Sequence, residues 1–137
     1  MFGYIHSGIR VRYADTDQMG YVYYGNYARF YEIARVEALR SLGFTYKEME
    51  EDGTMMPVYD NYCRYFQPAR YDDLLSVKVM IAALPTARVL FEYEIRNQED
   101  VLINTGKTTL VFLNRTTNRP VRAPKSLLEK LKPYFEK

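Results

Sequence analysis

Two aspartates and two glycines lie close together near the start of the chain, in the segment Tyr13–Tyr27 (YADTDQMGYVYYGNY). Asp15 and Asp17 fall between an apolar N-terminal stretch and a predicted helix. A carboxylate beside a helix N-terminus can act as a base or nucleophile while the free N–H groups of the helix stabilise a developing oxyanion. Gly20 and Gly25 allow close backbone approach or a positive φ. This segment is therefore the strongest candidate for catalysis.

Two residue types on which many other active sites depend are nearly absent. Cys63 is the only cysteine and His6 the only histidine. One cysteine excludes an intramolecular disulfide and metal sites built on cysteine pairs, and one histidine argues against a zinc site or a Ser-His-Asp triad. We therefore predict no metal site. We expect Cys63 to be a small buried hydrophobe and His6 to be structural.

Composition is that of an ordinary globular protein. The 137 residues include 19 basic and 17 acidic side chains, for a net charge of +2, and 47% of them are apolar. This length fits one domain spanning residues 1–137, and the balanced charge argues against nucleic-acid binding. No run approaches the ~20 apolar residues of a membrane span, and no signal-peptide pattern opens the chain. We expect a cytoplasmic protein.

A long helix is predicted directly after the aspartate segment. Asn26 is its predicted N-cap, residues 27–42 form it, and Gly43 ends it. Thr45 and Glu48 then form a capping-box pattern that predicts a short second helix. The apolar side chains at helical spacing on one face of the long helix are Tyr27, Phe30, Tyr31, Ala34, Ala38 and Leu42.

The remaining chain favours strands, because beyond Gly53 the apolar period changes to two. Strands are predicted over residues 4–13, 55–66, 75–81, 89–95 and 108–112, and a last helix over 124–135. Short connections between successive strands favour antiparallel pairing. The pattern predicts an α+β architecture in which one long helix covers one face of a curved antiparallel sheet. The other face needs a cover, and a second subunit is the natural candidate.

Three runs of sequence then identify a family. The run YADTDQMGYVYYGNYARFYEIAR at 13–35 resembles the N-terminal signature of the 4-hydroxybenzoyl-CoA thioesterase family, a branch of the hotdog-fold acyl-CoA thioesterases. The likeness continues through RYFQPARYDDLLSVKV at 64–79 and RVLFEYEI at 88–95, and covers the chain from about Ile9 to about Pro124. It implies a hotdog fold, with an antiparallel five-stranded sheet wrapped around one long helix.

The resemblance also implies a function. Members of the family hydrolyse an acyl-CoA or acyl carrier protein thioester to a free acid and a thiol, so coenzyme A is part of the substrate and no cofactor is implied. The family's catalytic carboxylate falls on Asp17, as nucleophile on the thioester carbonyl or as general base for a water. The N–H groups around Tyr24 and Gly25 would polarise the thioester oxygen.

Asp15 is expected to orient the loop, the Tyr24 side chain to lie near substrate, and Arg88 to lie near the CoA phosphates. A homodimer or homotetramer, with active sites at subunit interfaces, is expected.

Some alternatives stay open. Many bacterial relatives carry histidine where this chain has Tyr24, so no histidine can act at that position here. A hotdog dehydratase generally pairs a histidine with a carboxylate, and only His6 is available for that role. A non-catalytic acyl-thioester or acyl-carrier-protein binding module would use the same fold. The acyl group is also open, and the tyrosine-rich strand at 55–66 is a candidate to line its pocket.

Overall fold

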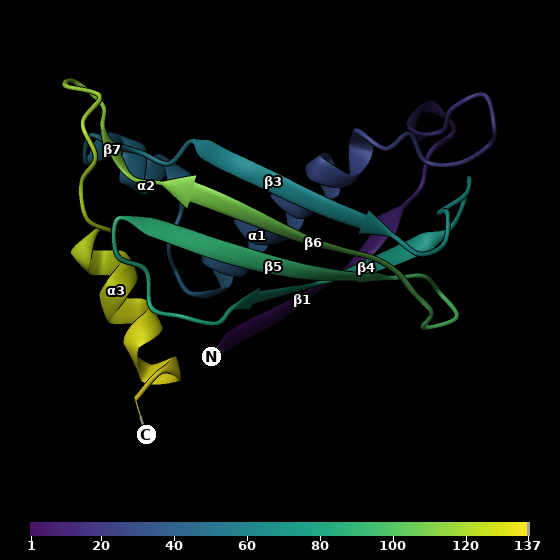
Figure 1. The fold of residues 1–137 in the computed structure, drawn as a ribbon. Coiled ribbons are helices and arrows are strands. Elements are labelled where there is room, and N and C mark those ends of the chain that lie inside the picture. The colour runs from purple at the N-terminus through teal and green to yellow at the C-terminus, as the bar shows by residue number, and fades with distance from the viewer. Residues whose placement is uncertain (137) are drawn as a thin grey trace.

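Five antiparallel strands form one sheet that curves around a long helix, α1 (Asn26–Ser41), as Figure 1 shows. The structure is a computed structural model and describes residues 1–136. The strands lie in the order β1-β4-β5-β6-β3, and every neighbouring pair is antiparallel. Their bounds are β1 (Phe2–Arg10), β3 (Val58–Tyr65), β4 (Leu74–Ile81), β5 (Arg88–Arg96) and β6 (Leu102–Val111). The predicted α+β hotdog architecture is confirmed.

Shorter elements complete the fold. They are the strands β2 (Thr54–Met55) and β7 (Leu113–Asn114), the helices α2 (Tyr46–Glu51) and α3 (Lys125–Leu131), and the 3-10 turns η1 (Tyr13–Asp15) and η2 (Lys132–Tyr134). The predicted cap of α2 is present, because the Thr45 hydroxyl accepts the Glu48 N–H at 3.2 Å. None of the helices in residues 1–136 is long and apolar enough to cross a membrane.

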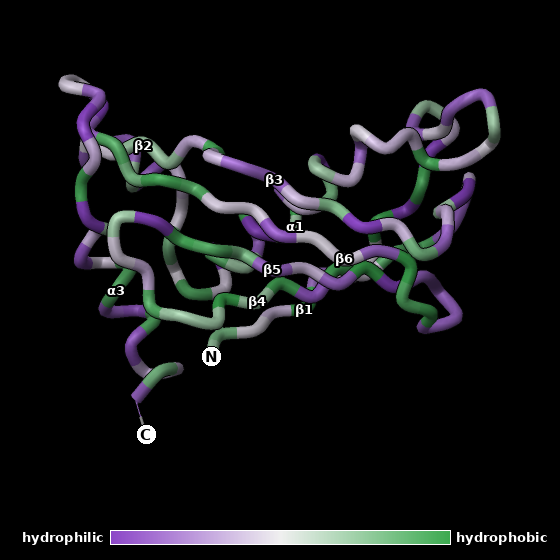
Figure 2. The backbone as a smooth tube through the Cα atoms, viewed as in Figure 1, coloured by the Kyte–Doolittle hydropathy of each residue, from purple (hydrophilic) through white to green (hydrophobic). Residues whose placement is uncertain are grey.

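The core lies between α1 and one face of the sheet. The helix side chains that it buries include Tyr27, Phe30, Tyr31, Ala34, Ala38 and Leu39. The alternating residues of β4 and β5 that face them are Leu75, Val77, Val79, Ile81, Val89, Phe91, Tyr93 and Ile95. Burying each large apolar side chain contributes about 1.5–3 kcal/mol, so this layer holds the helix against the sheet. In Figure 2 both colours occur along the strands, with β4 largely hydrophobic and the edge strand β3 largely hydrophilic.

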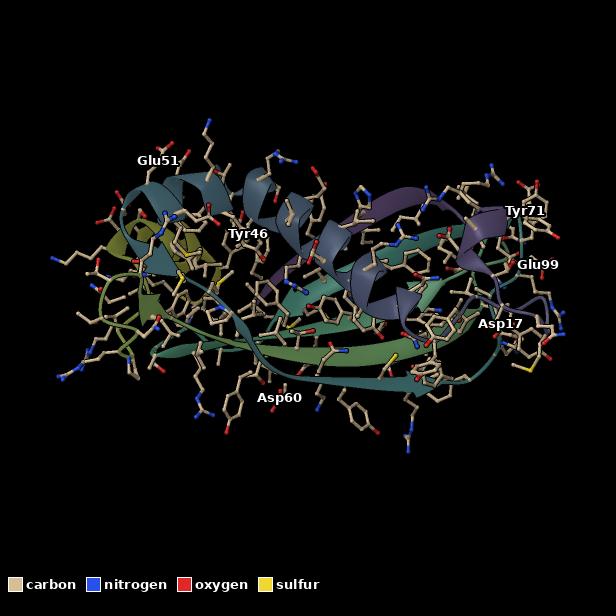
Figure 3. All side chains as sticks on the ribbon, turned by 90° about the horizontal axis from the view of Figure 1, so that it is seen from above. Asp17, Tyr46, Glu51, Asp60, Tyr71 and Glu99 are labelled. Carbon is tan, nitrogen blue, oxygen red and sulfur yellow. The ribbon has the colours of Figure 1, made fainter. Side chains whose placement is uncertain are left out.

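The opposite face of the sheet carries cross-strand pairs of opposite charge beside exposed apolar side chains, and its cover by a second subunit stays a prediction. Lys107 lies opposite Glu92, and Glu94 lies opposite Lys78. Cross-strand pairs of opposite charge are favourable on a face that meets water. Asp60 also points away from α1, as Figure 3 shows. Exposed large apolar side chains lie at Ile5 of β1 and Leu90 of β5, and along β3, an edge strand that pairs only with β6.

Several predicted boundaries differ from the structure, including the ends of β1 at Arg10 and of α3 at Leu131. The strand predicted at 55–66 divides at Pro57 into β2 and β3, because proline has no N–H to donate to a sheet. The strand predicted at 108–112 is longer and begins at Leu102, since pairing with neighbours on both sides overrides its weak apolar pattern. Asn26 is not the N-cap of α1, because Gly25 holds that position and makes no side-chain cap.

Candidate active site

Asp15 anchors the loop that leads into α1. Its carboxylate is 3% exposed and accepts the Arg12 N–H at 2.8 Å and the Arg29 guanidinium at 2.6 Å. Burial by itself raises the pKa of Asp15, but hydrogen bonds from Arg12 and the charges of Arg29 and Arg12 outweigh burial and lower the pKa below its ordinary value. The predicted role of Asp15 in orienting the loop is supported by these bonds.

The main chain of Asp15 also connects the loop to the start of α1. Its carbonyl oxygen accepts the Tyr23 N–H at 2.9 Å and the Asn26 side-chain amide at 2.8 Å. The Asn26 side chain therefore stabilises the entry into the helix by bonding back to the loop rather than by capping the helix. Because Asp15 is bonded to Tyr23 and Asn26, the loop residues between them are held in one conformation.

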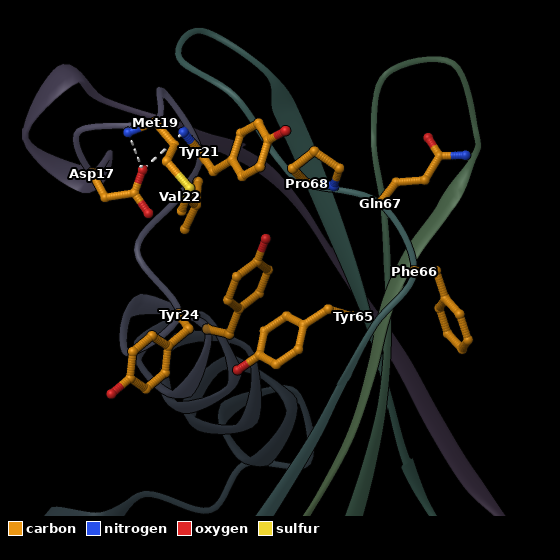
Figure 4. A pocket seen from close by; sticks show the side chains of 10 residues that line it. Asp17, Met19, Tyr21, Val22, Tyr24, Tyr65, Phe66, Gln67 and Pro68 are labelled. Carbon is orange, nitrogen blue, oxygen red and sulfur yellow. Dashed lines mark hydrogen bonds between the residues drawn. The ribbon is translucent and has the colours of Figure 1, made fainter.

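Asp17 lies in a tight turn that holds one of its carboxylate oxygens and leaves the other free. Oδ1 accepts the N–H of Met19 at 2.9 Å and that of Tyr21 at 3.2 Å, as the dashed lines in Figure 4 show. Gly20, in the same turn, has a φ of +81°, which glycine adopts without strain. Among residues 1–136, no group donates a hydrogen bond to Oδ2. The carboxylate is thus fixed through one oxygen, and its other oxygen is left without a protein partner in the described part of the chain.

The first N–H groups before α1 are also free. Within the part of the chain that the structure describes, the N–H groups of Tyr24 and Gly25 donate to no acceptor. They lie at the positive end of a 16-residue helix, where backbone donors and the helix dipole favour negative charge. Gly25 has a negative φ of −65°, and a Cβ added there would lie 2.8 Å from the Tyr23 ring. The neighbouring atoms belong to the exposed Tyr23 ring, which can rotate away, so neither positive φ nor backbone crowding requires glycine at this position.

A pocket of about 290 Å³ lies between this loop, the first turn of α1 and the end of β3 (Figure 4). Its lining is mostly aromatic and apolar, which suits an acyl group more than a charged ligand. The structure therefore brings Asp17 and Tyr24 together at one cavity. The lining residues are Asp17, Met19, Tyr21, Val22, Tyr24, Tyr27, Tyr65, Phe66, Gln67 and Pro68.

Arg88 lies away from this pocket. It is the first residue of β5, and its guanidinium stacks on the Tyr59 ring with 4.5 Å from Cζ to the ring centroid. In Figure 1 the start of β5 lies near α3, at the opposite end of the sheet from the loop that precedes α1. Figure 3 shows Asp17 and Glu51 of α2 at opposite ends of the molecule. One chain alone does not bring Arg88 to the pocket that holds Asp17.

Sequence reasoning missed part of the site. The sequence places Tyr27 only in the apolar face of the helix and predicts no role for Gln67 and Pro68. Tyr65 and Phe66 belong to the strand at 55–66, a predicted candidate to line the acyl pocket, and both line it. The one available signal was the run RYFQPAR at 64–70, which carries part of the family resemblance. Strand pairing at β3 then positions the end of this run opposite the start of α1.

The single cysteine differs from its predicted role. Cys63 is half-buried, and its sulfur lies 3.2 Å from the Tyr31 hydroxyl and 3.1 Å from the Asn104 amide nitrogen. The Tyr31 hydroxyl also donates to Asn104 Oδ1. Cys63 is therefore part of a polar cluster beneath α1 instead of a plain apolar contact. Residues 1–136 contain no group of three or more histidine, cysteine or acidic side chains that could hold a metal ion.

Comparison with known proteins agrees with this arrangement. The family model described as the thioesterase-like superfamily matches residues 11–131. The acyl-CoA thioesterase YbgC of Haemophilus influenzae is 36% identical over 121 residues, which cover 87% of this chain and 88% of that protein. The acyl-CoA thioester hydrolase YbgC of Escherichia coli is 32% identical over 124 residues, which cover 90% and 92%. The crystal structure of a DHNA-CoA thioesterase from Staphylococcus aureus superposes with a TM-score of 0.85 at 36% identity, covering 98% of this chain and 85% of that one. The chain belongs to the thioesterase-like superfamily and is a hotdog-fold thioester hydrolase.

Proposed function

We propose that this protein hydrolyses an acyl-CoA thioester to a free acid and a thiol, with Asp17 as the reactive carboxylate. One observation carries the proposal: Asp17 Oδ1 is held by two backbone N–H groups, while Oδ2 is free in an apolar pocket at the start of α1. The names of the YbgC relatives support coenzyme A as the thiol.

The proposed chemistry uses the free oxygen of Asp17 and the free N–H groups of Tyr24 and Gly25. The thioester oxygen accepts hydrogen bonds from the N–H groups of Tyr24 and Gly25, which stabilise the negative charge that develops on it. Positioned donors of this kind contribute about 100- to 1000-fold each in rate. Oδ2 of Asp17 either attacks the carbonyl carbon or accepts a proton from the attacking water. In the first route the C–S bond breaks to give a mixed anhydride and a thiolate, and water then hydrolyses the anhydride.

Water is the only co-reactant in either route, so we propose that no cofactor takes part. An acyl carrier protein presents the same thioester and remains the second substrate to test. We also propose a cytoplasmic location, which is supported by the lone thiol of Cys63 and by the acyl-CoA substrate.

We further propose that the protein is a homodimer formed through the free edge of β3. Four large side chains of this strand are 48–60% exposed, and a long uncovered edge strand is a surface that natural proteins normally pair or block. They are Val58, Tyr59, Tyr62 and Tyr65. Antiparallel pairing of β3 with its copy would bring the start of one strand to the end of the other. The partner subunit's Arg88, stacked on its Tyr59, would then lie beside the Tyr65 end of β3, where the pocket is.

The function is tested by measuring free-thiol release from a panel of aromatic, short-chain and medium-chain acyl-CoAs and from acyl carrier protein thioesters. Asp17→Asn keeps an oxygen for the Met19 and Tyr21 N–H groups but replaces the free oxygen by an amide. We expect it to lower kcat by at least about 100-fold while the fold is unchanged. The exposed Asp52→Asn is the matched control and should hydrolyse at the normal rate. Full activity of Asp17→Asn would refute the assignment of Asp17.

Two further measurements separate the alternatives. Binding of acyl-CoA without any thiol release would favour a non-catalytic binding module. In a single turnover in ¹⁸O-water, a mixed anhydride that water opens at the aspartate carbon leaves the label in the Asp17 carboxylate, whereas general-base catalysis places the label only in the product acid. Light scattering tests the dimer, which should have twice the mass of one chain. A monomer would contradict pairing through β3.

A further inference from the structure

The Tyr27 hydroxyl is a buried group at the pocket with an unused hydrogen. Tyr27 is the second residue of α1 and is 2% exposed. Its ring lies edge-on to Phe30 at 5.9 Å and to Tyr65 at 5.2 Å between centroids, so its position is fixed by packing on two sides. Even so, it lines the same cavity as Asp17.

The hydrogen bonds of this hydroxyl are half complete. Its oxygen accepts the Ala69 N–H at 3.4 Å. Within residues 1–136 its own O–H hydrogen has no acceptor. Buried polar groups in folded proteins normally have their hydrogen bonds satisfied, so a buried donor that borders a cavity suggests that something in the cavity accepts from it.

The place of Tyr27 in the helix directs this donor to the reaction centre. Side chains in a helix lean toward its N-terminus and cover the preceding turn. A tyrosine in the first turn therefore extends its hydroxyl beyond the helix end. That is where the free N–H groups of Tyr24 and Gly25 lie. Ala69, which donates to the hydroxyl, also accepts the Val22 N–H at 2.8 Å, so this side of the pocket is connected to the same loop.

We propose that the Tyr27 O–H donates a third hydrogen bond to the thioester oxygen as it becomes an oxyanion, beside the two backbone N–H groups. This inference rests on the proposed function. Tyr24 and Tyr65 also line the cavity, but they are 66% and 48% exposed, so water can satisfy their hydroxyls. Burial raises the pKa of Tyr27, and the hydrogen bond from the Ala69 N–H lowers it only in part. The nearby Cys63, Asp73 and Asp17 raise this pKa further. The hydroxyl therefore stays a donor through the neutral range.

The test is Tyr27→Phe, which removes the hydroxyl and keeps the ring. With an acyl-CoA that the unmodified protein hydrolyses, we expect kcat to fall about 100- to 1000-fold, as for the loss of other oxyanion donors, while KM changes less than about threefold. Tyr31→Phe is the matched control, because it removes another buried tyrosine hydroxyl one turn along the same helix, outside the pocket. It should leave kcat unchanged even if it lowers the melting temperature.

A second measurement distinguishes donation to the oxyanion from a structural role. A coenzyme A derivative with a trifluoromethyl ketone in place of the thioester forms a tetrahedral oxyanion and should bind Tyr27→Phe more weakly by the factor lost in kcat/KM. A non-hydrolysable thioether analogue should bind both proteins equally. Equal loss of affinity for both analogues, or an unchanged kcat, would overturn the role of Tyr27.

Fluorotyrosine at position 27 retains the hydroxyl and should restore most of the rate, which covers the case in which Tyr27→Phe folds poorly. Failure of this rescue in a folded protein would also overturn the proposal. The proposed function is judged separately by Asp17→Asn. If Asp17→Asn loses turnover and Tyr27→Phe does not, only the role of Tyr27 is wrong. If Asp17→Asn keeps full turnover, the proposed function itself is wrong.

Discussion

Replacing Arg29 by glutamine tests whether the ion pair with Asp15 holds the catalytic loop. Helix α1 carries two arginine–carboxylate pairs. Arg29 pairs at 2.6 Å with Asp15, whose side chain is only 4% exposed. Arg40 pairs with Glu37, and their side chains are 57% and 32% exposed. The two arginines thus differ mainly in the burial of the partner, which makes Arg40→Gln a matched control.

The magnitude follows from what each substitution leaves behind. A hydrogen bond to a charged group contributes about 1.5–3 kcal/mol. Arg12 still bonds Asp15 after Arg29→Gln, through its N–H at 2.8 Å and its guanidinium at 3.2 Å. The loss therefore stays below the ~3–5 kcal/mol of leaving a buried charge unpaired. We expect Arg29→Gln to lower the free energy of unfolding by about 1.5–3 kcal/mol, and Arg40→Gln by about 0–1 kcal/mol.

Thermal unfolding followed by circular dichroism measures this difference. For a chain of this size 1 kcal/mol corresponds to roughly 3–5 °C in Tm. Turnover should also fall, by about 10- to 100-fold for Arg29→Gln. The loop that positions Asp17 then keeps only the Asn26 link to α1, and small displacements of reacting groups have effects of this size. Equal stability losses for the two arginine variants would refute the reasoning, and so would an unchanged turnover of Arg29→Gln.

Two other predictions concern stability. Because the folded-state pKa of Asp15 is lowered, Asp15 contributes stability that is present above its ordinary pKa of 3.8 and is lost as pH falls through the folded pKa. Asp15→Asn should therefore be less stable at neutral pH, and its stability should fall less steeply with pH on the acid side. An unaltered acid side of the stability-against-pH curve would contradict this. Gly106→Ala should lower the free energy of unfolding by about 1–3 kcal/mol in denaturant titrations, because a Cβ there would overlap the Tyr31 ring. Gly3→Ala is the control and should lower it less, because a Cβ there has only one neighbouring atom, at 3.9 Å. An equal loss of stability for the two variants would show that α1 moves away from β6 easily.

Local spacing in the sequence was enough to predict most elements. The helical period over 27–42 and the alternation in 75–81 and 89–95 predict the elements that build the core, because one face of each must be apolar to pack against the other. The structure confirms α1, β4 and β5 within one or two residues. The run at 13–35 also identified the family, since it combines an uncommon set of acids, glycines and tyrosines.

Patterns that depend on neighbours were predicted less well. The first half of β6 has Asn104, Thr105 and Gly106 and no apolar alternation, yet it pairs on both sides with β3 and β5. The charge pairing on the outer face of the sheet also depends on neighbours. Its alternate residues are visible in each strand, but the opposition of Lys107 to Glu92 exists only once the register is set.

The sequence by itself determined the kind of protein this is: a hotdog thioesterase with a candidate reactive carboxylate at Asp17. Tertiary structure decided how the site is built, because the pocket joins residues 17–27 to residues 65–68, which are distant in the chain. Only that meeting shows that Tyr27 belongs to the pocket as well as to the core. Only the length of β5 places Arg88 at the far end of the sheet. The reason is physical: side-chain periodicity is local, whereas a cavity is formed by segments whose separation in sequence carries no information about their separation in space.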